Sequence, residues 1–151
     1  VVRVTADCPL TDWRVFDQVV SLHLETGADY TSNTIERTYP KGLDVEIVRA
    51  KLLEVADAEG QDAYEREHVT PFFYRRPERF RIAQLPQSVD QNLWRWTVDT
   101  AADFAFTERV YRTLYPANRA FLSEEIAALP GARRTDPDDP GPNHLGEEQA
   151  A

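Results

Sequence analysis

Strand-like and helical patterns alternate along this chain, and the alternation constrains its fold more than any other feature. Apolar residues that run together or recur at every second position predict strands over residues 1–6, 28–33, 43–48, 80–85 and 93–98. Apolar residues at helical spacing predict helices over residues 13–24, 50–59, 62–75, 100–114 and 123–129. Because the two patterns alternate without an internal repeat, we predict an α/β fold with helices packed on a sheet.

Capping and turn residues mark where these segments begin and end. Asp12 is an N-cap candidate for the first helix, and Gly27 and Gly60 are placed to end the first and second helices. Pro71 is expected to kink the third helical stretch or to begin a new turn, because proline lacks the backbone donor that a helix interior needs. The segment 100–103 (TAAD) has a capping-box pattern and opens the fourth helix.

The 151 residues suit a single domain with its own core. We assign residues 1–130 to that domain. After Pro130 the composition changes to proline, glycine, acidic and small polar residues, so we expect residues 131–151 to be a disordered tail. The chain lacks methionine and opens directly on a strand-like run, from which we expect that an upstream segment has been removed.

The charge balance excludes a general nucleic-acid-binding protein. The formal net charge is -9, whereas phosphate backbones are held by clustered positive charge. No stretch is apolar enough for a bilayer span, and the single Cys8 cannot form an internal disulfide, so we expect a cytoplasmic protein. The three histidines have no recognisable zinc spacing. Cys8 follows Asp7, whose negative charge disfavours a thiolate, and we expect it to be a packing residue.

Two aspartates follow predicted strands. Asp7 comes after residues 1–6, and Asp99 comes directly after residues 93–98. α/β sheets bind ligands at the carboxyl ends of their strands, and Mg²⁺ commonly takes only one or two protein carboxylates. Aspartate is also common at strand ends and helix N-caps, and on the residues alone this capping interpretation is the stronger of the two.

Three motifs occur in an order that resembles a known family. They are residues 3–10 (RVTADCPL), 65–71 (EREHVTP) and 95–100 (RWTVDT), supported by 32–34 (SNT), 37–40 (RTYP) and 42–46 (GLDVE). Together they resemble the spore-coat polysaccharide cytidylyltransferase family over residues 1–129. That family is similar to the enzymes that make the cytidine-monophosphate derivatives of ketodeoxyoctonate and sialic acid. The resemblance implies the C-terminal portion of a three-layer nucleotide-diphospho-sugar transferase, with a Rossmann-like sheet and flanking helices.

The resemblance implies a magnesium-dependent transfer of CMP from CTP to a sugar hydroxyl with release of pyrophosphate, in surface polysaccharide biosynthesis. Asp7 and Asp99 match the family positions that hold Mg²⁺, and with the resemblance included we favour the metal interpretation. Such a reaction depends mainly on positioning and on charge neutralisation. The implied partners are CTP and a sugar acceptor, and related enzymes are commonly homodimers.

Two departures from the family pattern limit this interpretation. Ala101 and Ala102 stand where the family usually has proline and an acidic residue, a loss that should be mild because proline there only helps to start a helix. The family's N-terminal glycine-rich loop, which would bind the triphosphate, is absent. We therefore expect the isolated chain to be inactive. The alternative is a non-catalytic interaction or regulatory remnant of the same fold.

The resemblance also implies substrate contacts outside the metal site. It places Glu67 and His68 toward the sugar pocket, although a solvated helix face and a structural histidine explain them equally well. Asn33, Arg37 and Asp44 are further sugar-binding candidates, each with a turn or surface alternative.

Aromatic residues give two more patterns. Arginines interleave with aromatic residues over residues 72–81, for which we favour a solvated face over buried aromatics rather than a binding site for an anionic polymer. Trp94 and Trp96 alternate with Arg95, so both indoles should lie on one side of a strand. We interpret this pair as core or as a dimer contact, to which the polar-alternating, half-exposed segment 43–48 could also contribute.

Overall fold

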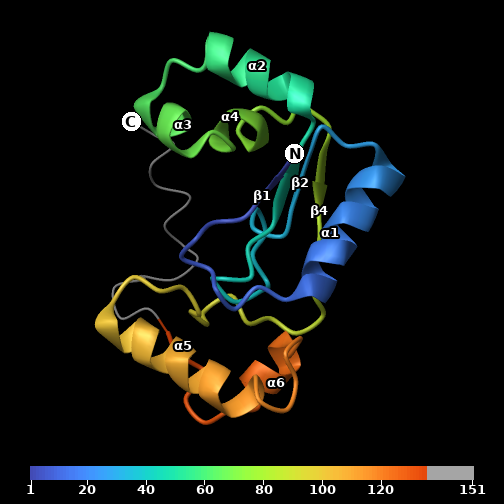
Figure 1. Ribbon diagram of the computed structural model, residues 1–151. Helices are drawn as coiled ribbons and strands as arrows, with labels where there is room; N and C mark the ends of the chain where they lie inside the picture. Colours follow the sequence, from blue (N-terminus) through green and yellow to red (C-terminus); the bar gives the residue numbers. More distant parts are fainter. Residues whose placement is uncertain (136–151) are drawn as a thin grey trace.

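The structure is a computed structural model and describes residues 1–135 as a mixed α/β fold (Figure 1). In chain order the elements are β1 (Val2–Arg3), α1 (Trp13–Thr26), β2 (Tyr30–Ser32), β3 (Glu46–Val48), α2 (Ala50–Glu59), α3 (Ala63–His68), α4 (Pro71–Tyr74), β4 (Ile82–Gln84), α5 (Ala101–Leu114) and α6 (Ser123–Ala127). Figure 1 shows α2, α3 and α4 at one end of the sheet, α5 and α6 at the other, and α1 alongside the strands. The predicted α/β class is confirmed.

The four strands form one sheet in the order β1-β3-β2-β4. β3 is antiparallel to both of its neighbours, whereas β2 and β4 are parallel. Three strands therefore run in one direction, with β3 reversed between β1 and β2. Since β1 and β4 lie at the edges, each has a sheet partner on one side only.

The helices follow the sequence signals closely because those signals are local. Asp12 accepts a hydrogen bond from the backbone of Arg14 at the start of α1, and Gly27 ends that helix in the left-handed conformation, with φ of 59°. Pro71 begins α4 and separates it from α3, as expected. The capping box at the start of α5 is also present.

The strands are shorter than predicted, and one of them is not a regular strand. Residues 93–98 form only an isolated parallel bridge, between Arg95 and Lys41. The Lys41 N–H donates to the Trp94 carbonyl at 2.8 Å, and the Trp96 N–H donates to the Lys41 carbonyl at 2.7 Å. Further backbone bonds of this segment go to Asp7 and Arg134, so its partners come from three separate parts of the chain.

The segment 43–48 was expected to be half exposed, and this prediction is wrong. Val45 and Glu46 are both buried, although they alternate as apolar and charged residues. Glu46 keeps its charge compensated inside the sheet because Arg3 pairs with it and the Tyr30 hydroxyl donates to it at 2.6 Å. An alternating pattern therefore predicts an exposed charged side chain only when the interior offers no ion-pair or hydrogen-bond partner for it.

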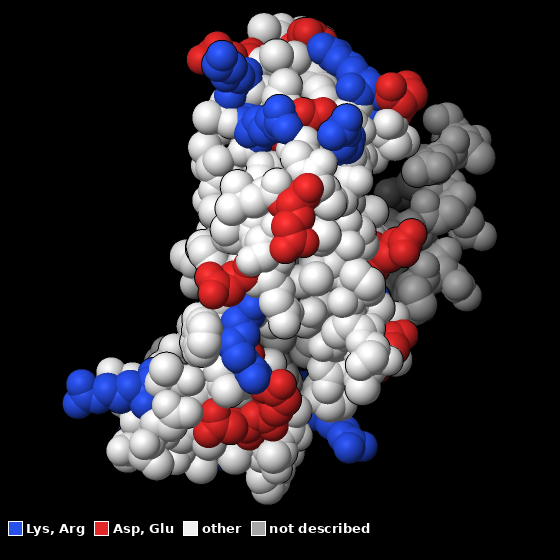
Figure 2. All heavy atoms as spheres, turned by 90° about the vertical axis from the view of Figure 1, so that its right-hand side faces the viewer, with Lys and Arg blue, Asp and Glu red and all other residues white. Residues whose placement is uncertain are grey.

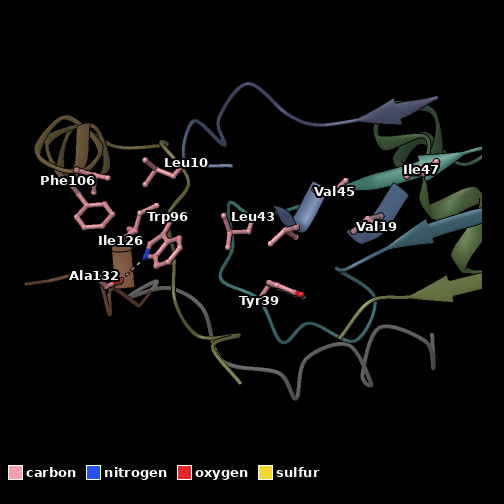
Figure 3. Close-up of a cluster of buried hydrophobic side chains, with 12 residues drawn as sticks. Leu10, Val19, Tyr39, Leu43, Val45, Ile47, Trp96, Phe106, Ile126 and Ala132 are labelled. Atoms are coloured by element: carbon pink, nitrogen blue, oxygen red, sulfur yellow. Dashed lines mark hydrogen bonds between the residues drawn. The ribbon is translucent and has the colours of Figure 1, made fainter. Parts of the chain in front are cut away.

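Two hydrophobic clusters hold these elements together. The larger one joins α1, the sheet, α5 and α6, and Figure 3 shows Trp96 between Phe106 and Leu43. The Trp96 side chain is fully buried, and its indole N–H donates to the carbonyl of Ala132 at 2.8 Å. The core interpretation of Trp96 is confirmed. Neither this side chain nor the segment 43–48 offers a surface for the dimer contact that the sequence suggested.

The smaller cluster packs the aromatic residues of α4 and its neighbours against β2 and β3; its buried members are Tyr30, Val48, Phe72, Phe73 and Phe80. At the other end of the chain, the predicted tail begins at residue 131. Its first residues are described, and Ala132 is buried in the larger cluster. Residues 136–151, to which most of that prediction applies, lie outside the described residues.

Candidate functional site

The two aspartates singled out by the sequence lie on neighbouring segments of the chain. Asp7 follows β1, and Asp99 lies just before α5. The Val98 N–H donates to the Asp7 carbonyl at 2.8 Å, which joins the two segments one residue before Asp99. The Asp99 side chain is 54% exposed and Asp7 is half-buried. Both carboxylates are thus accessible from solvent at one edge of the fold.

One oxygen of the Asp99 carboxylate is held by two donors. Asp99 Oδ2 accepts hydrogen bonds from Arg95 Nη2 and from Thr97 Oγ1, both at 2.9 Å. Arg95 Nε in turn donates to Thr97 Oγ1 at 3.1 Å. The side chain of Asp99 is therefore oriented by residues that precede it by only two and four positions.

Asp103 lies behind this arrangement and is 2% exposed. Its Oδ2 accepts from the backbone and hydroxyl of Thr100, from the backbone of Asp99 and from Arg95, while its Oδ1 accepts from Arg134 Nη2 at 2.6 Å. Burial acts to raise the pKa of Asp103, but these hydrogen bonds and the Arg95 charge outweigh it and lower the pKa below its ordinary value. The sequence indicated the capping box here, but not the two arginines.

The carboxylates of Asp7 and Asp99 suit Mg²⁺ better than a softer metal. No group of three or more His, Cys, Asp or Glu side chains is arranged to hold a metal ion within residues 1–135. Mg²⁺ needs only one or two protein carboxylates, since water and substrate phosphate oxygens fill its other positions. Asp7 and Asp99 offer hard oxygen donors on adjoining segments, and the oxygen of Asp99 that Arg95 and Thr97 leave open could face such an ion. These residues fit the ion that the sequence suggested.

Cys8 is a packing residue beside Asp7. Its side chain is buried and contacts Thr5 Oγ1 at 3.2 Å and Asp7 Oδ1 at 3.7 Å. Burial, together with the nearby charges of Asp44 and Asp7, raises the pKa of the Cys8 thiol to about 11. A protonated thiol is a poor nucleophile, so Cys8 has no catalytic part here.

Three of the predicted substrate-binding residues lie along the chain between β2 and β3. Arg37 binds Asp44 through two hydrogen bonds of 2.6 and 2.8 Å, and both side chains remain about one quarter exposed. Asn33 is fully buried: its amide donates to the Leu43 carbonyl at 2.8 Å and accepts from the Val45 N–H at 2.9 Å. Arg37 and Asp44 can reach a ligand, whereas the geometry gives Asn33 a structural role.

Glu67 and His68 lie in α3, and Figure 1 shows α3 and α5 at opposite ends of the sheet. The structure therefore does not bring them beside Asp99. Glu67 is exposed, and the His68 ring packs on Tyr64 with 4.3 Å between ring centroids. The sugar contact that the sequence suggested for these two residues stays a prediction.

The residue after His68 has an unusual backbone. Val69 has φ of 65° and ψ of -57°, and the Thr70 N–H donates to the His68 carbonyl at 2.7 Å. This is a γ-turn of the strained kind, which is rare for a β-branched residue. Val69 and Thr70 line a hollow of about 370 Å³ together with β1 and β3. Strained residues of this kind cluster at functional sites, so the turn at Val69 keeps the adjoining Glu67 and His68 as candidate site residues.

The arginines near α4 form a solvated face, as predicted. Arg76 binds Glu65 at 2.7 Å and lies over the Phe72 ring. Arg79 binds Glu59. On the face shown in Figure 2, basic and acidic side chains are interspersed and form no continuous basic surface.

Comparisons with known proteins identify the family of the chain. The profile of the family described as Cytidylyltransferase matches residues 1–125. An uncharacterised protein of Methanocaldococcus jannaschii is 35% identical over 106 residues, which cover 69% of this chain and 42% of that protein. The spore coat polysaccharide biosynthesis protein SpsF of Bacillus subtilis is 28% identical over 132 residues, which cover 85% of this chain and 54% of that protein.

A solved structure is also similar. It is a cytidylyltransferase from Leptospira borgpetersenii, with a TM-score of 0.75 and 32% sequence identity, and the match covers 82% of this chain and 52% of that one. The chain thus spans about half the length of the relatives that it matches. None of the helices within residues 1–135 is long and apolar enough to cross a membrane.

Proposed function

Because the chain belongs to the cytidylyltransferase family, we propose that it forms the metal-binding and sugar-side part of an enzyme that transfers CMP from CTP to a sugar hydroxyl. The observation that carries the proposal is the backbone hydrogen bond from Val98 to Asp7, which brings the half-buried Asp7 and the exposed Asp99, both in the family-matched region, to one edge of the fold. Neither carboxylate alone would distinguish a metal ligand from a capping residue.

In this reaction the sugar oxygen bonds to the α-phosphorus of CTP while the bond from that phosphorus to the bridging oxygen breaks. Pyrophosphate leaves, and the hydroxyl proton is released. Mg²⁺ held by Asp7 and Asp99 would neutralise charge on the phosphates and lower the pKa of the attacking hydroxyl. The chain's own residues position this site: Arg95 and Thr97 orient the Asp99 carboxylate, and the Val98 N–H fixes the backbone of Asp7.

The sugar side of the site is assigned to the exposed polar residues near Asp7. The charge of Asp44 acts on the thiol of Cys8, the neighbour of Asp7. Asp44 also pairs with Arg37, and both side chains are about one quarter exposed. A paired carboxylate and guanidinium offer acceptors and donors for sugar hydroxyls. Glu67 and His68 are kept as a second contact region, supported by the strained turn at Val69.

Several properties of the whole protein belong to this proposal. The printed name of the Bacillus subtilis relative supports a sugar acceptor destined for a surface polysaccharide. A buried, free Cys8 suits the reducing cytoplasm. The chain spans about half of its relatives, so we propose that a further segment binds the triphosphate and that the isolated chain is inactive. We also propose that the complete enzyme is a homodimer.

The test is pyrophosphate release from CTP and Mg²⁺ with a panel of nonulosonic and related sugars. It uses the protein in which this chain is joined to a nucleotide-binding segment. Asp7→Asn and Asp99→Asn should each lower the rate by about 100-fold, within the range for removing a group that acts on the transition-state charge. Asp17→Asn, at an exposed position on α1, is the matched control and should keep the full rate.

The competing function is a non-catalytic interaction domain, for which the exposed apolar residues of the β1 edge are the specific observation. Val1, Val2 and Val4 are 59%, 39% and 50% exposed. The same assay separates the two functions. Absence of pyrophosphate release with every sugar, in a folded protein that contains the nucleotide-binding segment, would favour the interaction domain.

A further inference from the structure

We propose that Thr97 and Arg95 are positioning residues that fix the carboxylate of Asp99 so that Oδ1, and not Oδ2, faces the divalent cation. The inference rests on the proposed function, because it assumes that Asp99 is a metal ligand. It gives a role to two residues of the 95–100 motif, where the sequence singled out only Asp99 as a site residue.

The hydrogen-bond inventory determines which way the Thr97 hydroxyl points. Arg95 Nε carries a proton and can only donate, so Thr97 Oγ1 accepts at their separation of 3.1 Å. The single hydroxyl proton of Thr97 is then free to go to Asp99 Oδ2, 2.9 Å away. Arg95 Nη2 donates to the same oxygen. Two directed donors on Oδ2 leave Oδ1 as the open oxygen.

Arg95 can act as a fixed reference because it is itself held on several sides. Its side chain is only 13% exposed, and Nη2 also donates to Asp103 Oδ2 at 2.9 Å. Asp103 is held from the other side by Arg134, and the Arg95 N–H donates to the Arg134 carbonyl at 2.7 Å. Arg134 lies beyond the family-matched residues 1–125, so a contact outside that region supports the site.

Asp99 needs this support because its own side chain is half exposed. An exposed carboxylate loses rotational freedom when it binds a metal, and prior orientation by neighbours removes part of that cost. Removing a side chain that hydrogen-bonds to a metal ligand typically lowers metal affinity or activity by about 10- to 100-fold. Thr97 is the sharper test of the pair, since replacing it with valine changes no charge, whereas any change at Arg95 also alters the field at the cation.

The experiment measures binding of Mn²⁺ alone to the 151-residue chain, by the relaxation of water protons during titration. Thr97→Val should weaken Mn²⁺ binding by about tenfold. Thr97→Ser keeps the hydroxyl and should bind within about twofold of the unsubstituted chain. Thermal unfolding of each variant is followed in parallel, so that affinity is compared only among folded proteins.

The matched control is Thr107→Val on α5. Thr97 and Thr107 are equally buried at 8% exposed, but Thr107 Oγ1 is buried with no hydrogen-bond partner among the described residues. Thr107→Val should leave Mn²⁺ binding unchanged, because it removes the same hydroxyl where nothing depends on it.

Each other outcome has a definite meaning. If Asp99→Asn abolishes Mn²⁺ binding while Thr97→Val binds like the unsubstituted chain, the positioning role is overturned and the metal assignment stands. If Thr97→Val and Thr107→Val weaken binding equally, the effect comes from loss of a buried hydroxyl in general, which also overturns the role. If Asp99→Asn binds Mn²⁺ unchanged, the metal assignment itself fails.

Discussion

At the scale of single residues, the molecule buries carboxylates only where several donors converge on them. Asp103 receives hydrogen bonds from two arginines and from the start of α5, and Glu46 receives them from Arg3 and Tyr30. Taking a lone charge out of water costs several kcal/mol, so each buried acid requires such a set of partners. Asp99 shares one of these sets but remains exposed, which makes it available to a ligand.

Cys8 gives the first prediction at this scale. Its thiol pKa is raised from 9.0 to about 11, so the thiol stays protonated and unreactive near neutral pH. Iodoacetamide should label the native protein at least tenfold more slowly than the protein unfolded in guanidinium chloride at pH 8, as measured by mass spectrometry. The raised pKa also makes the protein less stable as the pH rises from 9 toward 11. Equal labelling of native and unfolded protein would contradict the burial of Cys8.

Sequence alone indicated Asp7 and Asp99 but not the residues that hold them. Thr100 and Asp103 were recognisable as a capping box because the pattern is local. A local pattern could not predict the contact with Arg134, since its ion pair with Asp103 joins positions 31 residues apart. Asn33 shows a different case: its place near a strand end made it a sugar-binding candidate, whereas in the fold its amide bonds to the backbone ten and twelve residues away.

At the scale of elements, one carboxylate connects two helices. Asp12 Oδ1 caps α1 by accepting from the Arg14 N–H, and Asp12 Oδ2 accepts from the Ser123 N–H at the start of α6, each at 2.8 Å. The contact spans 111 residues and fixes the helix at the C-terminal end of the domain against the first one. Asp12 is 2% exposed, so both bonds are shielded from water.

Asp12→Ala should therefore lower the free energy of unfolding by about 2 kcal/mol, since it removes a helix cap and a second buried acceptor. Urea unfolding followed by circular dichroism measures the loss. Asp17→Ala, on the exposed face of the same helix, is the control and should change the free energy by less than about 0.5 kcal/mol. Equal effects of the two substitutions would show that Asp12 makes no special contact.

The same carboxylate predicts how stability depends on pH. Burial acts to raise the pKa of Asp12, but the bonds from Ser123 and Arg14 and the Arg14 charge outweigh it, and the pKa lies below its ordinary value of 3.8. The stability that Asp12 contributes is fully present above that value and is lost as the pH falls through the lower, folded-state pKa. The difference in unfolding free energy between the native chain and Asp12→Ala should shrink below pH 3.8. A difference that stays constant down to pH 2 would contradict this.

Gly42 allows the backbone at Trp96, in the segment that carries Asp99, to pack closely against its own backbone. Its φ is 107°, and a Cβ atom built there would lie 2.8 Å from the Trp96 carbonyl carbon, which belongs to the backbone and cannot easily move. Gly42→Ala should cost more than about 2 kcal/mol of unfolding free energy. Gly27→Ala also introduces a side chain at positive φ, but its nearest neighbour is a flexible arginine end at 3.6 Å, so it should cost only about 1 kcal/mol. Equal costs, measured by urea unfolding, would argue against the close approach.

Helices were predictable from the sequence more accurately than strands, and the reason is physical. The spacing of Leu52, Leu53 and Val55, with Gly60 behind them, gave the bounds of α2 because helix formation and ending depend on neighbouring residues. A strand needs a partner from elsewhere in the chain. Residues 93–98 have strand-like side chains, yet their backbone bonds divide among three separate segments and form no regular ladder.

At the scale of the whole molecule, apolar side chains are exposed at one edge of the sheet, whereas Trp96 of the predicted tryptophan pair is buried. Val2 lies in β1, and Val1 and Val4 flank that strand; all three line the same hollow as Val69. An edge strand with apolar side chains and open backbone groups tends to pair with another chain. The family relationship and the fold were accessible from ordered motifs, whereas this surface required the strand order.

The 151-residue chain should accordingly associate as its concentration rises. Sedimentation velocity should show a concentration-dependent shift toward larger species, and Val2→Lys should suppress it because a charged edge resists pairing. Leu24→Lys is the matched control: Leu24 is 74% exposed on α1, away from the edge, and its replacement should leave the association unchanged. A monomer at every concentration, or suppression by both substitutions alike, would exclude association through the β1 edge.

The central claim is that Asp7 and Asp99 hold one divalent cation between them, and a double-mutant cycle on Mn²⁺ affinity tests it most directly. A shared ion makes the two effects strongly non-additive. Asp7→Asn and Asp99→Asn should each remove most of the affinity, and the double variant should bind no more weakly than the weaker single variant. Effects that add as independent contributions, or no loss in either single variant, would contradict a shared site.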